Sequence, residues 1–217
     1  DPLMGIDPRT DLYKLLRELV LSNKNFEDPD FPKKDYSIFG VKGNRRQIQG
    51  RVVWKRPHEI LLKGNYKEIS LFNHPNLFDV VQGDIKDCYF ICPLVNLAGK
   101  LGTLQTLFNN SVSNKYGVYS VNFHVMGQIM EVLVDDYLPY NETKKEICFA
   151  KISRNQLWVA LLEKAWAKIN GDYNAINIGY TEESWYMLTG GPGAFYKTEQ
   201  YTKEEIWLML NDFVRND

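Results

Sequence analysis

Hydrophobic residues recur at helical spacing in four parts of the chain. In residues 10–23 the leucines fall on one face, and a threonine begins the stretch as an N-cap, so a helix is expected there. Residues 88–107 also favour a helix, and residues 153–171 predict the clearest one. A last helix is expected after Thr202, which can form a capping box with Glu205.

The helix predicted in residues 153–171 has the most regular pattern. Ser153 or Asn155 is expected to cap its N-terminus, and Gly171 is expected to end it. Its buried side is expected to consist of Trp158, Leu161, Leu162, Ala165 and Trp166.

Between residues 116 and 137 the hydrophobic period changes to two, which predicts β-structure. Gly127 marks a turn between two strands, so the segment is expected to form a β-hairpin. His124 alternates with the apolar positions and is expected to face the surface. Asp135 and Asp136 follow the second strand and are interpreted as a turn. The inward face of the first strand is expected to carry Tyr119, Val121, Phe123 and Val125.

Residues 25–57 are punctuated by prolines and glycines, yet they are rich in aromatic side chains, so we expect an ordered loop. Taken together, the patterns predict a compact α+β fold that is mostly helical, with a small antiparallel hairpin or sheet. We divide it into residues 1–70, an N-terminal helix and ordered loop leading into the core, and residues 71–217, one compact unit.

Composition narrows the class of protein. The chain has 217 residues and a formal net charge of -1, so no general affinity for nucleic acid or acidic membranes is expected. Its three cysteines show no paired spacing, which indicates reduced thiols and a cytosolic setting. The acidic N-terminus is no signal peptide. It lacks an initiator methionine, so we expect the chain to be a piece of a longer protein.

Cys88 stands at the start of the helical pattern in residues 88–107. The thiolate is the nucleophilic form of cysteine, and the unpaired N–H groups of a helix N-terminus favour it. Acyl transfer also needs donors for the developing oxyanion, and the side-chain amide of Gln82 can supply one beside the N–H of Cys88. The alternative is that Cys88 is a small buried core residue, as free cysteines often are.

Several motifs in order resemble the calpain family of papain-like cysteine proteases. The segment QGDIKDCYF resembles the family's Gln-Gly-x-x-Gly-Asp-Cys-Trp nucleophile segment. FEDPDFP and GRVVWKRPHEI resemble the approach to the protease core, and EVLVDDYLP, LWVALLEKAWAKINGDYNAI and LTGGPGAFY follow at the family's intervals. The resemblance covers residues 10–217 and implies the first, Cys-bearing subdomain of a papain-like calpain core.

The resemblance implies roles for two residues and the absence of two others. Cys88 would be the nucleophile, and Gln82 would be the oxyanion-hole donor. The family's catalytic His and Asn belong to a second subdomain, and none of His58, His74 and His124 matches the position of the base. His58 is expected to lie in a loop. This chain alone is therefore expected to be inactive. Whether the protein acts as an enzyme stays open.

Four residues near the nucleophile need comment. Lys86 stands where the family has Gly, and its side chain is expected either to lie in the substrate cleft or to favour the thiolate electrostatically. Tyr89 replaces the family's Trp. Pro93 falls inside the predicted helix and removes one backbone hydrogen bond. Cys92 is expected to be a core residue.

The resemblance also implies a calcium site in this half of the core. Asp79 would supply a carboxylate, and Phe72 and His74 would supply backbone carbonyls. Gln156 stands where the family has a glutamate ligand. Because Ca²⁺ affinity depends on the number of carboxylates, calcium is expected to bind weakly or not at all. No other cofactor is expected.

Two functions fit these observations. In the first, the chain is the N-terminal half of a calcium-regulated cysteine endopeptidase that acts on protein substrates, which the retained Cys88 and Gln82 favour. In the second, it is a catalytically silent calpain-like scaffold in a cytoskeletal or ciliary assembly, which Lys86, Pro93 and Gln156 favour. The expected partners are the second protease subdomain or other proteins of such an assembly, with no nucleic acid and no membrane. The expected location is cytoplasmic, with association with the cytoskeleton as an option.

Overall fold

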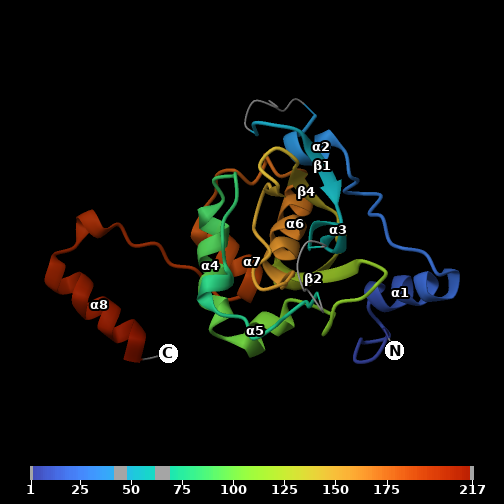
Figure 1. The fold of residues 1–217 in the computed structure, drawn as a ribbon. Helices are drawn as coiled ribbons and strands as arrows, with labels where there is room; N and C mark the ends of the chain where they lie inside the picture. Colours follow the sequence, from blue (N-terminus) through green and yellow to red (C-terminus); the bar gives the residue numbers. More distant parts are fainter. Residues whose placement is uncertain (1, 42–47, 62–68, 216–217) are drawn as a thin grey trace.

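The computed structural model describes residues 2–41, 48–61 and 69–215, which combine helices with two small antiparallel sheets (Figure 1). The helices are α1 (Asp11–Ser22), α2 (Asp35–Phe39), α3 (Pro57–Leu61), α4 (Cys88–Ala98), α5 (Leu101–Thr106), α6 (Trp158–Asn170), α7 (Thr181–Thr189) and α8 (Lys203–Arg215), with short 3-10 turns η2 (Leu77–Asp79) and η3 (Thr198–Gln200). The strands are β1 (Val52–Lys55), β2 (Val118–Val125), β3 (Gln128–Asp135), β4 (Leu138–Asn141) and β5 (Glu146–Ile147). The predicted α+β class is confirmed.

The helix predicted over residues 88–107 is in fact two helices. α4 ends at Gly99, and α5 begins only after Lys100, whose backbone is not helical (φ -120°, ψ 68°). Glycine lowers helix propensity by about 1 kcal/mol relative to alanine, so Gly99 and Gly102 together weaken the helix at this point. The hydrophobic spacing continues across the break and therefore did not indicate it.

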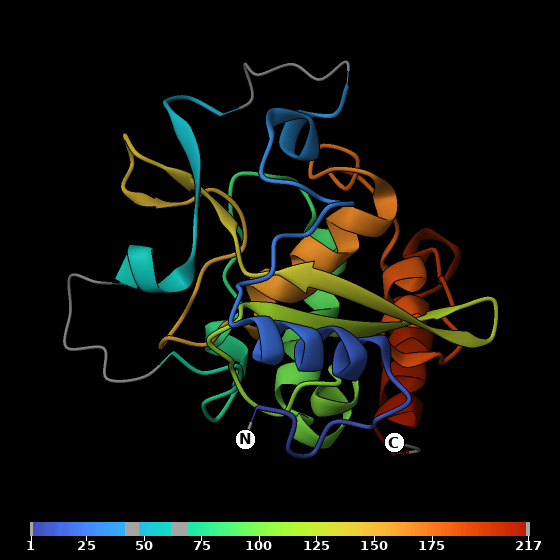
Figure 2. The ribbon, with the colours of Figure 1, turned by 90° about the vertical axis from the view of Figure 1, so that its right-hand side faces the viewer.

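The predicted β-hairpin is confirmed. β2 and β3 pair from Val118 opposite Asp135 to Val125 opposite Gln128, and Gly127 forms the turn at φ 77°. α1 lies along this hairpin (Figure 2) and begins at Thr10, whose hydroxyl accepts a hydrogen bond from the Tyr13 N–H (3.2 Å). The side chains of β2 that were expected to face inward, Tyr119, Val121 and Phe123, are buried, whereas Val125 is half-buried.

Residues 25–57 contain regular structure where an ordered loop was predicted. They include α2 and β1, and β1 forms a three-stranded antiparallel sheet with β4 and β5. In this sheet Trp54 lies opposite Pro139. A four-residue strand is too short to show a clear alternation, and its partner lies about 85 residues further on. Residues 42–47 of this segment lie outside the described residues.

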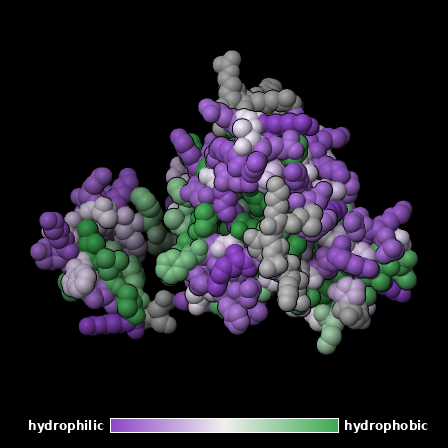
Figure 3. Space-filling model, viewed as in Figure 1, coloured by the Kyte–Doolittle hydropathy of each residue, from purple (hydrophilic) through white to green (hydrophobic). Residues whose placement is uncertain are grey.

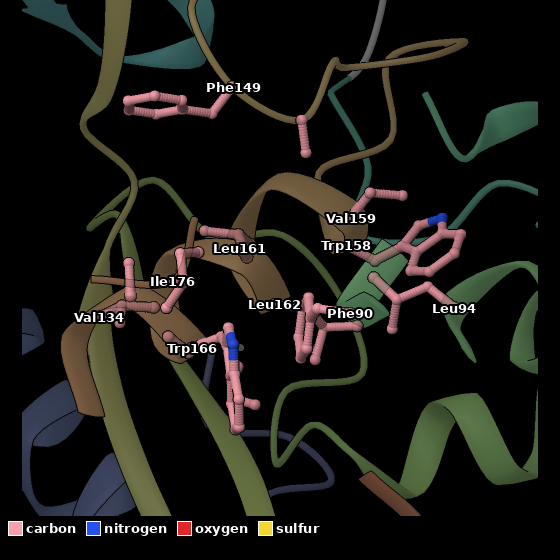
Figure 4. Packing of buried hydrophobic residues seen from close by; sticks show 14 of the residues in the cluster. Phe90, Leu94, Val134, Phe149, Trp158, Val159, Leu161, Leu162, Trp166 and Ile176 are labelled. Atoms are coloured by element: carbon pink, nitrogen blue, oxygen red, sulfur yellow. The ribbon is translucent and has the colours of Figure 1, made fainter. Parts of the chain in front are cut away.

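α6 forms the centre of the core, where α4, β2 and β3 pack against it (Figure 4). The predicted buried side is confirmed, and Trp166 stacks on Phe90 with ring centroids 5.0 Å apart. The predicted N-cap is wrong, because the helix begins at Trp158 with Leu157 as its cap residue and no side-chain cap. Ser153 instead donates a hydrogen bond to Asp79 (3.1 Å). Gly171 ends the helix as predicted.

Asp135, the last residue of β3, and Asp136, the next residue, are buried, so their interpretation as a simple turn after the strand was incomplete. Asp135 forms an ion pair with Lys164, and Asp136 forms one with Arg56. Asp135 also accepts a hydrogen bond from the Asp28 N–H (2.7 Å). Because α6 is enclosed by other elements, even Lys164 of this helix is buried and requires a carboxylate partner inside the fold.

α8 stands apart from the rest of the chain at the end of an extended segment (Figure 1). Its predicted capping box is confirmed by hydrogen bonds between Thr202 and Glu205 in both directions. None of its residues is buried, and an apolar stripe runs along it (Figure 3). The exposed apolar side chains on this helix are Trp207, Leu208, Leu210, Phe213 and Val214.

Candidate active site

Cys88 is the first residue of α4 and is exposed, so the alternative that it is a buried core residue is wrong. The preceding residue, Asp87, is the N-cap, and its carbonyl accepts hydrogen bonds from the N–H groups of Phe90 (2.8 Å) and Ile91 (3.0 Å). Among the described residues no acceptor takes the N–H of Cys88. A thiol and an available backbone donor therefore lie together at the start of a helix.

The loop before the nucleophile is held against the segment that leads into α6. The Asp84 N–H donates to the Cys148 carbonyl (2.7 Å), and the Lys151 N–H donates to the Val81 carbonyl (2.9 Å). A Cβ atom on Gly83 would lie 2.3 Å from backbone atoms of Phe149, which no real contact allows. Glycine at this position lets the two segments approach closely enough to fix the loop.

Gln82 lies in this loop, and its amide group points into the protein. The side-chain Nε2 donates to the Ile85 carbonyl (2.7 Å) and to Asp87 Oδ1 (3.0 Å). An amide nitrogen has two protons, so both donors are used within the loop. The structure brings Gln82 to the residue next to Cys88, but neither of its amide protons is free.

Asp87 is fully buried, and its carboxyl group lies next to Glu163 of α6. Burial raises the pKa of Asp87 to about 6, although the contact with Glu163 and a hydrogen bond from Gln82 act in the opposite direction. Burial also raises the pKa of Glu163 well above its usual value, and the charge of Asp87 adds to this effect. Sequence reasoning missed Glu163, because a glutamate in a long amphipathic helix is ordinarily expected to face water.

Pro93 lies inside α4, where its missing N–H leaves one carbonyl of the first turn without its usual helical partner. That carbonyl belongs to Tyr89, and it accepts a hydrogen bond from the Ser184 hydroxyl (2.7 Å). The hydroxyl of Tyr89 accepts one from Trp166 Nε1 (3.0 Å). The proline is therefore accommodated by a side chain of α7, and the start of α4 is fixed on two sides.

The three histidines lie in other surroundings. His58 belongs to the short helix α3 instead of a loop, and it lines a cavity together with Arg56 and Asp136. His74 is exposed. His124 is half-buried instead of facing the surface, because its ring lies 2.7 Å from where a Cβ atom on Gly190 would be. Among the described residues no histidine makes a hydrogen bond with Cys88.

The expected calcium ligands gather in one place, but a guanidinium group lies among them. Arg154 donates from Nε to Asp79 Oδ1 (2.7 Å), from Nη2 to Asp79 Oδ2, and from Nη2 to the His74 carbonyl (2.9 Å). Burial of Asp79 favours its neutral form, but hydrogen bonds from Arg154 and the Asn76 N–H outweigh burial and lower its pKa to about 2. Sequence reasoning missed Arg154.

Gln156 is buried and connects the same two segments. Its Oε1 accepts a hydrogen bond from the Asn73 N–H (2.7 Å), and its backbone forms a parallel bridge with Ser70. Phe72, whose carbonyl was an expected ligand, packs edge-on against Phe108. In the part of the chain that the structure describes, no three His, Cys, Asp or Glu side chains converge as metal ligands.

The other two cysteines differ from each other. Cys148 is buried, and burial raises the pKa of its thiol to about 12, so it is not reactive. Cys92 was predicted to be a core residue, but it is exposed, one helical turn beyond Cys88. It lines a groove of about 420 Å³ between α4 and α7, together with Trp185 and Phe195. Lys86 is exposed and does not line this groove.

The sequence of the chain is similar to those of proteins described as calpains. The protein family described as "Calpain family cysteine protease" matches residues 26–217. The chain is 32% identical to "Calpain-type cysteine protease ADL1" of Oryza sativa subsp. japonica over 191 residues, covering 83% of this chain and 8% of that protein. It is 34% identical to "Calpain-type cysteine protease DEK1" of Zea mays over 184 residues, covering 81% of this chain and 8% of that protein.

A nematode relative matches a larger share of both chains. "Calpain clp-1" of Caenorhabditis elegans is 31% identical over 206 residues, covering 94% of this chain and 25% of that protein. The chain therefore spans a quarter or less of the length of these three relatives. Among the described residues no helix is both long enough and apolar enough to cross a membrane.

Proposed function

Since the chain belongs to the calpain family of cysteine proteases, we propose that it is the nucleophile-bearing half of a cysteine endopeptidase and is inactive on its own. The observation that carries the proposal is the position of Cys88, exposed at the first residue of α4 with a backbone N–H that no acceptor among the described residues takes. A helix N-terminus favours the thiolate and supplies a donor to an oxyanion.

In this proposal Cys88 attacks the carbonyl carbon of a substrate peptide bond, and the oxygen of that carbonyl becomes the oxyanion. The Cys88 N–H is available to stabilise it. The second donor, the amide of Gln82, first has to break one of its two internal hydrogen bonds. A general base must also take the thiol proton and deliver a proton to the leaving amine, and no histidine in the described residues is placed for this.

Peptide hydrolysis tests the proposal. The chain alone is expected to cleave no casein-type substrate, because a positioned base contributes roughly 10²–10⁴-fold in rate. A longer form that adds the family's His and Asn is expected to cleave it, and Cys88→Ala in that form should abolish cleavage. If the chain alone hydrolyses the substrate and Cys88→Ala removes this activity, the proposed inactivity is wrong.

We also propose that calcium does not regulate this half of the protein. The expected ligands do not fit Ca²⁺, because Arg154 already donates to both oxygens of Asp79 and to the His74 carbonyl. Gln156 adds no charge, and its Oε1 is used by the Asn73 N–H. A hard dication prefers several carboxylate oxygens, whereas here a guanidinium already neutralises the only expected carboxylate.

The groove beside Cys92 supports a proposal about partners. Its apolar lining includes Trp185 and the exposed Phe195, which is typical of a surface that another part of a protein covers. We propose that the second protease subdomain is this partner. Hydrogen exchange in a longer form should show protection gained at residues 82–90 and 190–195. Equal protection in the chain alone would contradict this.

The scaffold alternative makes a different prediction for the same longer form. A silent module would bind its assembly yet fail to cleave peptides even when His and Asn are present. The use of both Gln82 amide protons inside the loop is the observation that favours it. Cleavage that depends on Cys88 would exclude this alternative.

A further inference from the structure

Two buried carboxyl groups meet beneath the first turn of α4. Asp87 is 0% exposed and Glu163 is 1% exposed. One oxygen of each has a donor: Asp87 Oδ1 accepts from Gln82 Nε2 (3.0 Å), and Glu163 Oε2 accepts from the Ala150 N–H (2.8 Å). The other two oxygens, Asp87 Oδ2 and Glu163 Oε1, are buried and receive no hydrogen bond from the described residues.

The chemistry of this pair requires a proton. Two ionised carboxylates have only acceptor oxygens, so they repel each other and cannot form a hydrogen bond. One proton held between them turns one group into a donor and gives both remaining oxygens a partner. A buried polar atom without a partner destabilises the fold, so the protonated arrangement is favoured. Burial raises the pKa of both groups, and the charge of Asp87 raises that of Glu163 further, in agreement with this.

We propose that Asp87 and Glu163 share one proton and act together as positioning residues for Gln82 and for the start of α4. The proposal rests on the proposed function only for the role of Gln82 as an oxyanion donor. Asp87 connects three parts of the site: its carbonyl caps α4, one carboxyl oxygen holds the Gln82 amide, and the other faces α6. The pair thereby ties the nucleophile to the centre of the core.

No neighbouring group replaces the shared proton. Lys151 is the cation that faces Glu163, but its ammonium group is bound to the Ile147 carbonyl and lies 3.4 Å from Glu146. Tyr173 and Tyr89 also face the pair, and burial raises the pKa of both phenols, so they are neutral at physiological pH.

The state of the pair determines how firmly Gln82 is held. When Asp87 is ionised, its Oδ1 is a strong acceptor for the Gln82 amide, because hydrogen bonds to charged groups are roughly twice as strong as neutral ones. When Asp87 carries the proton, this hydrogen bond weakens and the amide turns more easily toward a substrate. The side-chain amide of Gln82 should therefore report the titration of the pair.

Infrared spectroscopy tests the shared proton. The wild-type chain at pH 7 is expected to show the carbonyl band of a buried protonated carboxyl group, and Glu163→Gln should remove it. Glutamine keeps the shape and can donate to Asp87 Oδ2, so the fold should be retained. Glu204→Gln removes an exposed carboxyl on α8 and should leave the band unchanged. Absence of the band in the wild-type chain at pH 7 would overturn the proposal.

The side-chain amide resonance of Gln82 in NMR spectra tests the positioning role, and it can be assigned by its loss in Gln82→Met. In the wild-type chain it is expected to shift with a midpoint near pH 6, the pKa of Asp87, and in Asp87→Asn the shift should disappear. A midpoint near the ordinary value of about 4, or a shift that persists in Asp87→Asn, would contradict the proposal. The wild-type titration decides the matter even if a variant fails to fold.

Both measurements are made without substrate. A longer form that failed to cleave peptides would therefore refute the proposed function and leave the shared proton untouched. Loss of the infrared band together with normal peptide cleavage would refute the shared proton alone.

Discussion

Two buried aspartates lie on either side of Gln82, and the fold treats them in opposite ways. Asp79 is 2% exposed and is bound by the guanidinium of Arg154, so its pKa falls to about 2. Asp87 is fully buried beside Glu163, and burial raises its pKa to about 6. At Asp79 the hydrogen bonds from Arg154 and the Asn76 N–H outweigh the effect of burial, whereas at Asp87 burial outweighs the hydrogen bonds.

The loop between the two aspartates is held at both ends by contacts within the protein. On one side an arginine supplies a positive charge and three hydrogen bonds to the residues around η2. On the other side, one shared proton removes the repulsion between the carboxyl groups of Asp87 and Glu163 under α4 and lets them form a hydrogen bond. The first attachment depends on charge and the second on neutrality, so they should fail under opposite conditions of pH.

The largest expected effect on stability comes from removing the carboxyl group of Glu163, which shares the proton with Asp87. Glu163→Leu leaves Asp87 Oδ2 and the Ala150 N–H buried without partners, so the free energy of unfolding should fall by roughly 3–5 kcal/mol. Glu163→Gln keeps both contacts and should cost about 1 kcal/mol. Urea denaturation measures both. Equal losses in the two variants would show that volume, not hydrogen bonding, determines the effect.

The second prediction is that the contributions of Asp87 and Asp79 to stability depend on pH in opposite directions. The folded chain holds the proton of Asp87 more tightly than the unfolded chain, so stability should decrease as pH rises from about 4 to 6. Asp79 has a lowered pKa, so its contribution is present above about 4 and is lost as pH falls toward 2. Each proton taken up or released changes the unfolding equilibrium about tenfold per pH unit.

Arg154→Gln should lower stability above about pH 4 and flatten the fall in stability toward pH 2, and it should leave the decrease between pH 4 and 6 unchanged. A matched control is Arg9→Gln, since Arg9 forms an exposed ion pair with Asp7, whose pKa is also lowered to about 2. Salt screens exposed pairs, so 1 M NaCl should abolish the effect of Arg9→Gln and leave most of that of Arg154→Gln. An equal response to salt in both variants would show that the Asp79 pair behaves as a surface pair.

The sequence predicted much of the fold but few of these contacts. The period of two revealed β2 and β3, and the period of 3.6 revealed α6, because each of these elements has a regular buried face. Periodicity assumes that polar residues face water, and α6 violates this since Glu163 and Lys164 are buried. Their partners, Asp87 and Asp135, lie far away in sequence, so no local pattern joins them.

At the candidate site the family motif identified Cys88 and Gln82, and the structure added their surroundings. Cys92 was predicted to be buried because free cysteines usually are, but α4 turns it to an open groove. Arg154 gave no local signal, because it precedes α6 by four residues in a loop with positive φ. Only the fold brings it to Asp79.

The third prediction concerns substitutions that should turn the surroundings of Asp79 into a calcium site. The wild-type chain should show no tight calcium binding by calorimetric titration, and Gln156→Glu alone should add little because Arg154 remains. Arg154→Ala combined with Gln156→Glu leaves two carboxylates and the nearby carbonyls, so binding should strengthen. Micromolar affinity in the wild-type chain would show that calcium displaces Arg154.

The smallest expected effect concerns the start of α4 itself. Ser184→Ala removes the hydroxyl that donates to the Tyr89 carbonyl, which Pro93 leaves without its helical partner. The free energy of unfolding should decrease by about 1 kcal/mol. If Pro93→Ala is introduced first, the helix regains its own donor, and Ser184→Ala should then cost less. If Ser184→Ala lowers the free energy of unfolding equally with and without Pro93→Ala, the hydroxyl does not stabilise the fold through the Tyr89 carbonyl.

The account depends most on the claim that Asp79 and Asp87 are held in opposite states. Carbon-13 NMR of the side-chain carboxyl groups, followed from pH 2 to pH 8, measures both in one sample of the wild-type chain. The account predicts that Asp79 titrates near pH 2 and Asp87 near pH 6. Titration of both groups near the ordinary value of about 4 would contradict it.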